Sequence, residues 1–123
     1  MLNLNSILVG SENPKKLITF YEKIIGKNTD LGEGEWAGFK VGDGFLTIGP
    51  HSEVKGSNKE PGRLLFNFET EDVKSEFTRI KNLGARVVTE PYHPEQESGM
   101  LIATFADPDG NYFQLMNSMD MSN

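Results

Sequence analysis

The chain has 123 residues, a length typical of a single domain that buries roughly two-thirds of its unfolded surface. Its net charge is −6 and its longest basic run is Lys15-Lys16, so neither nucleic acid nor a membrane is expected as a partner. The chain lacks cysteine, which excludes disulfides and thiolate chemistry, and residues 1–9 carry no basic segment or long apolar run. We therefore expect a soluble, cytoplasmic protein.

The first half of the chain predicts a strand, a helix and a hairpin. Residues 6–9 form a short, mainly apolar run that predicts a strand, and Asn13-Pro14 suits a helix N-cap followed by the first helical residue. One helical face is apolar, and Gly26 suits the C-cap. That face consists of Leu17, Ile18, Tyr21, Ile24 and Ile25. After a short segment at residues 27–31, the apolar runs Trp36–Val41 and Phe45–Ile48 flank Gly42-Asp43-Gly44, which predicts a hairpin.

The second half repeats this order. It predicts a strand at Arg63–Glu69, a helix from about Glu71-Asp72 to a cap at Gly84, and three further strands. Those strands are Arg86–Val88, Met100–Phe105 and Asn111–Met116. His51–Gly62 is interpreted as a linker and Glu90–Gly99 as an acidic loop.

The predicted fold class is therefore α+β, with two βαβββ modules at about residues 1–58 and 59–123 forming a cupped mixed sheet in a single domain, 1–123. Each open four-stranded half exposes a face that must be covered, and two such halves enclose a cleft. An ordinary α+β sandwich with an accidental repeat remains the alternative.

A turn near the C-terminus is the strongest local signal. In Asp107-Pro108-Asp109-Gly110-Asn111, proline presets φ, aspartate side chains bond nearby N–H groups, and glycine tolerates positive φ. The five residues predict a tight reversal into a strand. Turn chemistry alone would favour an ordinary hairpin.

Several motifs together resemble the vicinal oxygen chelate superfamily, which includes glyoxalase I, bleomycin-resistance proteins and extradiol dioxygenases. They are Asn13-Pro14, Phe20-Tyr21, Ile24-Ile25-Gly26 and Phe105-x-Asp107-Pro108-Asp109-Gly110-Asn111 with its trailing strand. The resemblance implies two βαβββ modules that form a cup, usually completed in a homodimer, with a small-molecule site inside the cup.

The resemblance also implies four metal-ligand positions, which here fall on Ser6, Thr47, Leu65 and Gln114. A divalent cation needs imidazole or carboxylate donors to offset its dehydration, and these residues supply none. We therefore expect no metal and no other cofactor. Without a Lewis acid, glyoxalase-type isomerisation and ring cleavage lose their electrophile.

Other polar residues offer a weaker case for chemistry, and no catalytic residue is assigned. His51 and His93, the two histidines, could join Glu53, Glu95 and Glu97 in an unorthodox metal site. Their placement in predicted loops favours solvated side chains instead. No nucleophile with a paired base and no glycine-rich phosphate loop is found.

We predict the ligand-binding residues from strand alternation. Every second residue along a strand points to the same face, so residues at even spacing from the four implied metal-ligand positions should also point into the cup. The nominated residues are Ser6, Phe45, Thr47, Arg63, Leu65, Asn67, Tyr112, Gln114 and Met116. For each aromatic residue, core packing is the alternative. Arg63 could bind a carboxylate or phosphate, or simply be exposed at the start of its strand.

Three functions remain open. The leading hypothesis is a homodimer that binds a small organic molecule in its cup without the usual metal. The second is a lyase, isomerase or dioxygenase-like enzyme with a rearranged metal site or metal-free acid/base chemistry. The third is a non-catalytic dimeric interaction module.

Overall fold

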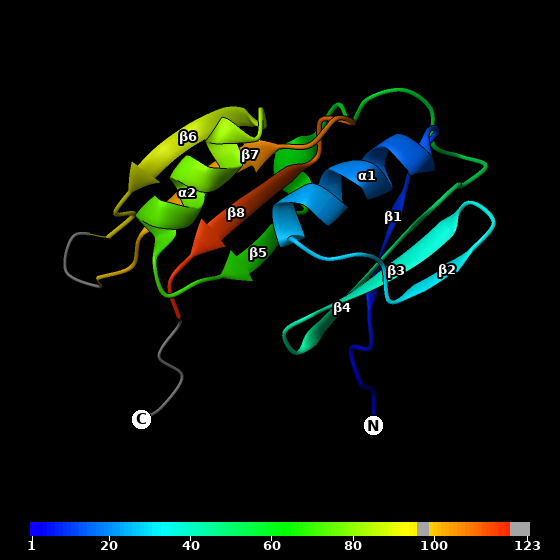
Figure 1. Ribbon diagram of the computed structural model, residues 1–123, viewed down its shortest axis with the longest axis horizontal. Coiled ribbons are helices and arrows are strands. Elements are labelled where there is room, and N and C mark those ends of the chain that lie inside the picture. The colour runs from blue at the N-terminus through cyan, green and yellow to red at the C-terminus, as the bar shows by residue number, and fades with distance from the viewer. Residues whose placement is uncertain (96–98, 119–123) are drawn as a thin grey trace. The chain divides into compact units, whose positions relative to one another are not determined.

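The computed structural model describes residues 1–95 and 99–118. The chain divides into two compact units, Met1–Ser57 and Asn58–Asn123. Each unit has the element order β-α-β-β-β, and each contains one four-stranded mixed sheet and one α-helix (Figure 1). The predicted α+β fold of two βαβββ modules is confirmed.

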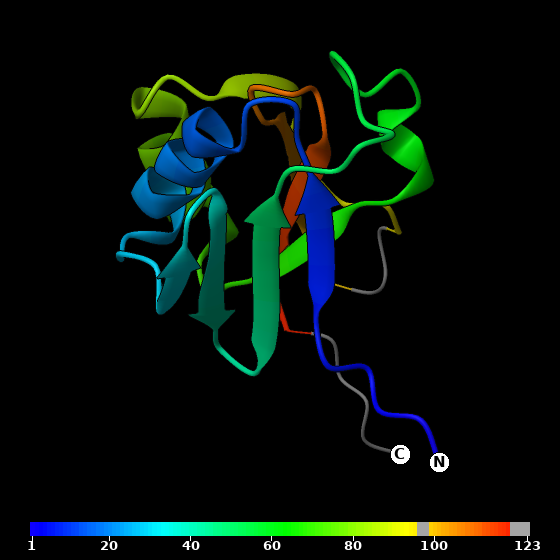
Figure 2. The same ribbon diagram turned by 90° about the vertical axis from the view of Figure 1, so that its right-hand side faces the viewer.

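The first unit contains four strands and one helix. They are β1 (Ile7–Gly10), α1 (Pro14–Ile25), β2 (Leu31–Glu33), β3 (Trp36–Val41) and β4 (Gly44–Gly49). The strand order is β1-β4-β3-β2, with β1 parallel to β4 and the other pairs antiparallel (Figure 2). The β3–β4 hairpin pairs Val41 with Gly44 around a two-residue turn, as Gly42-Asp43 predicts.

Helix α1 begins and ends where its capping residues predict. The Asn13 side chain accepts from the Lys16 N–H at 3.5 Å, and Pro14 occupies the first turn. Gly26 has a φ of +84° and donates its N–H to the Glu22 carbonyl at 2.9 Å. This left-handed conformation explains the need for glycine at the C-cap.

The core of the first unit lies between α1 and one face of its sheet. From α1, Leu17, Tyr21 and Ile24 are buried, and α1 contacts β3 and β4. From the strands, the buried apolar side chains occupy every second position and face the helix. They are Val9, Ala37, Phe39, Leu46 and Ile48. The intervening residues consequently lie on the face away from α1.

The second unit repeats the plan. It contains a 3-10 turn (Pro61–Arg63), β5 (Phe66–Glu69), α2 (Val73–Asn82), β6 (Arg86–Tyr92), β7 (Ile102–Ala106) and β8 (Tyr112–Met116). The strand order β5-β8-β7-β6 matches that of the first sheet, again with one parallel pair, β5 and β8.

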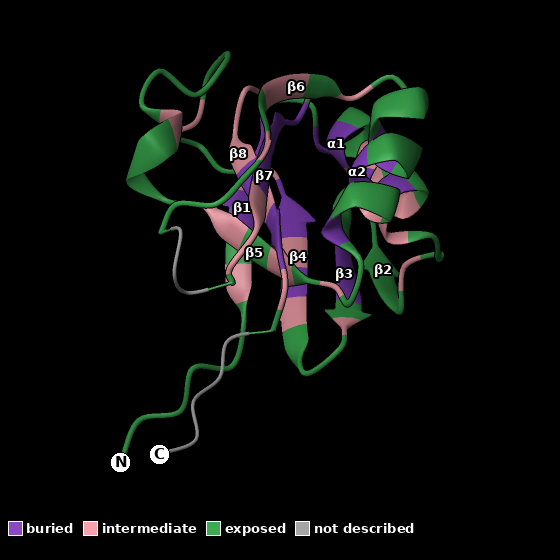
Figure 3. Cartoon of the chain, turned by 90° about the vertical axis from the view of Figure 1, so that its left-hand side faces the viewer, coloured by how far each residue is buried: buried purple, intermediate pink, exposed green. Residues whose placement is uncertain are grey.

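Aromatic rings fill the core of the second unit. Phe105 is fully buried, with its ring centroid 5.2 Å from that of Phe77 on α2 and 5.5 Å from that of Phe113 on β8. Helix α2 is capped by Asp72, whose carboxylate accepts from the Ser75 N–H at 3.0 Å. Figure 3 shows buried residues on one side of each helix and exposed residues on the other.

Two predicted boundaries are wrong. The strand expected at Arg63–Glu69 begins only at Phe66, because the Arg63 N–H donates to the Glu60 carbonyl at 3.1 Å and closes a 3-10 turn. Strand β6 continues to Tyr92, so Glu90 lies in a strand rather than in a loop. Register shifts interrupt its pairing with β7, which explains the weak strand pattern of its sequence.

The Asp107 turn forms as predicted. The Asp107 side chain is 5% exposed, and its Oδ1 accepts from the N–H groups of Asp109 at 2.9 Å and Asn111 at 3.0 Å. Gly110 has a φ of +82°, a left-handed conformation that glycine adopts without steric cost. Within the described part of the chain, no helix has the length and apolar character needed to cross a membrane.

Candidate functional site

The first sheet has an open face on the side away from α1. The strand register aligns Leu31, Gly38, Thr47 and Leu8 in one row across all four strands. Leu31 is 64% exposed and Leu8 is 48% exposed, an unusual state for large apolar residues on a sheet. We call this surface the first-sheet face. It consists of Leu8, Leu31, Glu33, Trp36, Gly38, Phe45, Thr47 and Gly49.

Two glycines let aromatic rings lie against this face. A Cβ atom on Gly49 would overlap the indole carbons of Trp36, and a Cβ atom on Gly38 would lie 2.8 Å from Cε1 of Phe45. Each glycine is therefore needed for close approach rather than for backbone freedom. Trp36 nevertheless remains 45% exposed, so one side of its indole is available for contact.

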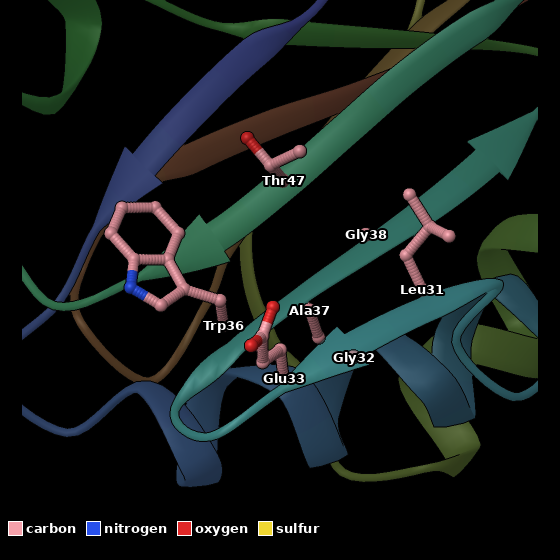
Figure 4. A pocket seen from close by; sticks show the side chains of 7 residues that line it. All are labelled: Leu31, Gly32, Glu33, Trp36, Ala37, Gly38 and Thr47. Carbon is pink, nitrogen blue, oxygen red and sulfur yellow. The ribbon is translucent and has the colours of Figure 1, made fainter.

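A cavity of about 320 Å³ opens on the first-sheet face. It is lined by Leu31, Gly32, Glu33, Trp36, Ala37, Gly38 and Thr47. Figure 4 shows the side chains of Trp36, Thr47, Leu31 and Glu33 on one side of the strands. The cavity is shallow and open to solvent, and its mostly apolar lining with a few polar groups is a feature that sites for small molecules share.

Two polar side chains of the lining, those of Thr47 and Glu33, offer hydrogen-bond acceptors to the cavity. Thr47 donates its hydroxyl proton to the Ile7 carbonyl at 3.1 Å, because a carbonyl can only accept. The Thr47 oxygen therefore offers lone pairs to the cavity. Within the described residues, the Glu33 carboxylate has no ion-pair partner, since none of the salt bridges there includes it. Both side chains consequently suit a ligand that donates hydrogen bonds.

A polar network anchors the wall formed by β2. The Asp30 carboxylate accepts from Lys27 Nζ at 2.7 Å and from the Lys40 N–H at 2.6 Å, and the Asp30 N–H donates to the Gly38 carbonyl at 2.8 Å. The Lys27 hydrogen bond, followed by that of the Lys40 N–H, lowers the pKa of Asp30 from its ordinary value of 3.8. This network fixes Leu31, the next residue, beside β3.

The second sheet also has a face turned away from its helix. Asn67, Gln114 and Thr104 form a row across β5, β8 and β7, and Gln114 Nε2 donates to Thr104 Oγ1 at 3.2 Å. Tyr112 and Met116 share this face by alternation, as nominated. Met116 is 8% exposed and offers little surface for contact.

Three other nominated residues lie outside the strands: Ser6, Arg63 and Leu65. Ser6 precedes β1 and is exposed, and Leu65 precedes β5. The expected inward strand position of Arg63 is wrong: this residue belongs to the 3-10 turn, where its guanidinium binds Glu60 Oε2 at 3.0 Å. Phe45 and Thr47 lie on the first-sheet face, as their phase predicts.

Four lining residues with side chains were missed: Leu31, Glu33, Trp36 and Ala37. The hairpin itself could have identified Trp36. Counting back from the Val41–Gly44 pair places Gly38 opposite Thr47, and Trp36 shares the phase of Gly38. Strand β2 has only three residues, too few for a periodic signal, so Leu31 and Glu33 had no comparable indicator.

The residues at the implied metal positions do not fit a divalent cation. Thr47 uses its proton on a backbone carbonyl, Gln114 presents a neutral amide bonded to Thr104, and Leu65 has no donor atom. The histidines are engaged locally: His51 Nδ1 accepts from the Glu53 N–H at 3.1 Å, and His93 Nδ1 lies 2.9 Å from the Met100 carbonyl. Among residues 1–95 and 99–118, no three acidic or histidine side chains are close enough to hold a metal. Glu97, proposed for the alternative site, lies outside the described residues.

Comparison with known proteins shows which family this chain resembles. A family model described as a glyoxalase-like domain matches residues 6–116. No curated protein matches the chain. Solved structures match over nearly the whole chain. A conserved domain protein has 23% identity and a TM-score of 0.79, with 96% of this chain and 100% of that chain covered.

Two other solved structures carry more specific names. A glyoxalase/bleomycin resistance protein/dioxygenase family enzyme from Burkholderia phytofirmans has 19% identity and a TM-score of 0.75, with 96% of this chain and 100% of that chain covered. A fosfomycin resistance protein from Listeria monocytogenes, complexed with Mn(II) and 1S,2S-dihydroxypropylphosphonic acid, has 19% identity and a TM-score of 0.72, with 98% and 93% covered. At these identities the likeness shows the fold alone. Together with the family model, which spans most of the sequence, it identifies the chain as a member of the glyoxalase-like domain family, within the vicinal oxygen chelate superfamily.

Proposed function

We propose that this protein binds a small organic molecule on the first-sheet face, without the divalent metal of its better-known relatives. The observation that carries the proposal is the cavity of about 320 Å³ beside Trp36 and Leu31. Burying an exposed leucine or indole surface under a ligand is favourable at roughly 25 cal/mol per Å² of apolar area. A flat, partly aromatic molecule would cover both side chains while resting on Gly38.

The chemistry of the side chains at the implied metal-ligand positions supports binding without a metal. Among the positions implied for ligands, the hydroxyl of Thr47 and the amide of Gln114 are already hydrogen-bonded to protein groups. Neither side chain carries charge with which to offset the dehydration of a cation.

An enzyme remains the second candidate class, as a glyoxalase-like lyase or isomerase. Acid/base catalysis usually requires two groups that exchange a proton with the substrate. Among the residues that line the cavity, Glu33 is the single titratable side chain. This composition favours binding over turnover. Metal analysis of protein purified without chelators provides a check, because a stoichiometric ion that is lost in His93→Ala would support the enzyme.

Trp36 makes the binding proposal directly testable, because it is the one tryptophan of the chain. Its fluorescence should change when a ligand from a library of small aromatic compounds binds. Leu31→Ala should weaken binding several-fold through lost apolar contact. Leu64→Ala is the matched control, since Leu64 is 65% exposed and lies in the other unit. A library without any hit, or equal effects of both variants, would contradict the proposal.

The expected homodimer and cytoplasmic location belong to the same proposal. Strand β1 is an edge strand, and it is preceded by the exposed residues Leu2 and Leu4, which a second copy could cover. The lack of cysteine is consistent with a reducing compartment. A closed interaction module, the third possibility, predicts a dimer that binds none of the library compounds.

A further inference from the structure

The cavity on the first-sheet face presents three electron-rich groups to the same space. Glu33 and Trp36 are directly paired across β2 and β3, and opposite residues of such a pair have Cβ atoms about 4.5–5.5 Å apart. Figure 4 shows the Glu33 carboxylate and the indole of Trp36 on the same side of the strands as Thr47.

Each of the three groups favours a positive or hydrogen-bond-donating partner. The Trp36 ring carries negative electrostatic potential on its face and attracts a cation within about 6 Å of the ring centroid. The Glu33 carboxylate can only accept hydrogen bonds, and the Thr47 oxygen accepts because its proton is bonded to the Ile7 carbonyl.

No positively charged side chain lines the cavity, and the indole N–H of Trp36 is a neutral hydrogen-bond donor. Its lining residues include no lysine, arginine or histidine. Lys40 lies on the same face of β3 as Trp36 and Gly38, but it is four residues away from Trp36 and does not line the cavity. A carboxylate or phosphonate ligand would therefore face Glu33 without a compensating charge, at a cost in affinity.

We propose that the cavity selects a ligand with an ammonium group attached to a flat apolar body. This inference rests on the proposed binding function and specifies its ligand class. The ammonium group lies between Glu33 and Trp36, with one N–H directed at Thr47 Oγ1. The apolar body extends over Gly38 toward Leu31.

The test compares three soluble probes of similar shape and different charge: benzylamine, benzyl alcohol and benzoate. Because Trp36 is the one tryptophan, its indole N–H gives one cross-peak in a proton–nitrogen correlation spectrum. We expect benzylamine to shift this peak with an affinity about fivefold higher than benzyl alcohol and with a larger advantage over benzoate. The advantage should decrease with added salt.

Glu33→Gln should lower the affinity for benzylamine by about fivefold and that for benzyl alcohol much less, because the glutamine amide oxygen still accepts a hydrogen bond. Glu35→Gln is the control, since it removes the same charge nearby from a residue that does not line the cavity. Equal affinities for the three probes, or equal effects of the two variants, would overturn the charge preference while leaving the binding site intact. Failure of all three probes and of the aromatic library to shift the peak would instead overturn the binding function itself.

Discussion

Gly49→Ala tests whether Trp36 rests on the first sheet as described. The new Cβ atom would overlap the indole ring, so the ring must move away from β4. Trp36 is 45% exposed, so the sheet covers about half of its surface. A tryptophan side chain has an area of roughly 250 Å², and burying half of it contributes about 3 kcal/mol at about 25 cal/mol per Å². Alanine returns about 0.5–1 kcal/mol through lower chain entropy, since Gly49 does not need positive φ. We expect a net loss of about 2 kcal/mol.

The assay is urea unfolding followed by circular dichroism, combined with the emission maximum of Trp36. Displacement of the ring should move the emission toward that of solvated indole. Gly44→Ala is the control in the same strand, because its Cβ atom would meet no atom closer than the Val41 carbonyl at 3.5 Å. That variant should be neutral or slightly stabilising. Equal stability and unchanged emission in Gly49→Ala would refute the described packing of Trp36.

Three further predictions concern the scaffold. Phe105→Ala should reduce the free energy of unfolding by about 3–5 kcal/mol, measured by denaturant titration, because the ring is fully buried; a loss below about 1 kcal/mol would contradict this. Asp107→Ala should cost about 2 kcal/mol or more by the same measurement, because two turn N–H groups lose their acceptor, and a neutral effect would argue against that turn. Asp30→Asn should be less stable than the wild type at pH 7, since the folded-state pKa of Asp30 is lowered. The difference should disappear as the pH falls below 3.8, and a difference that persists at lower pH would contradict the charge effect.

The elements that sequence predicts well are those with local chemical signals. Asn13-Pro14 and Gly26 mark both ends of α1, and Gly42-Asp43 marks the β3–β4 turn. In each case a cap or a positive φ depends on residues within a few positions. The Asp107 turn belongs to the same class, because its aspartate bonds N–H groups two and four residues later.

The elements that sequence predicts poorly depend on distant or irregular contacts. Arg63 was expected on a strand, but Glu60 binds both its guanidinium and its N–H and forms a turn instead. Strand β6 extends to Tyr92 through two register shifts, which remove the alternation that marks a regular strand.

The candidate site was predicted in part. Alternation correctly placed Phe45 and Thr47 on one face, because both belong to a strand with a clear period. Leu31 and Glu33 come from a three-residue strand whose position is fixed by the Asp30 network, not by its own sequence pattern. A cavity wall of this kind becomes visible only when the neighbouring strand is known.

The central claim is that a small molecule binds beside Trp36 on the first-sheet face. Intermolecular nuclear Overhauser effects between a bound aromatic amine, such as benzylamine, and the protein test it most directly. We predict contacts from the probe ring to the Trp36 indole protons, the Leu31 methyl groups and the Thr47 methyl group. Contacts confined to the second sheet, for example to Met116, would contradict the account, as would saturation of the protein with the probe without any contact to Trp36.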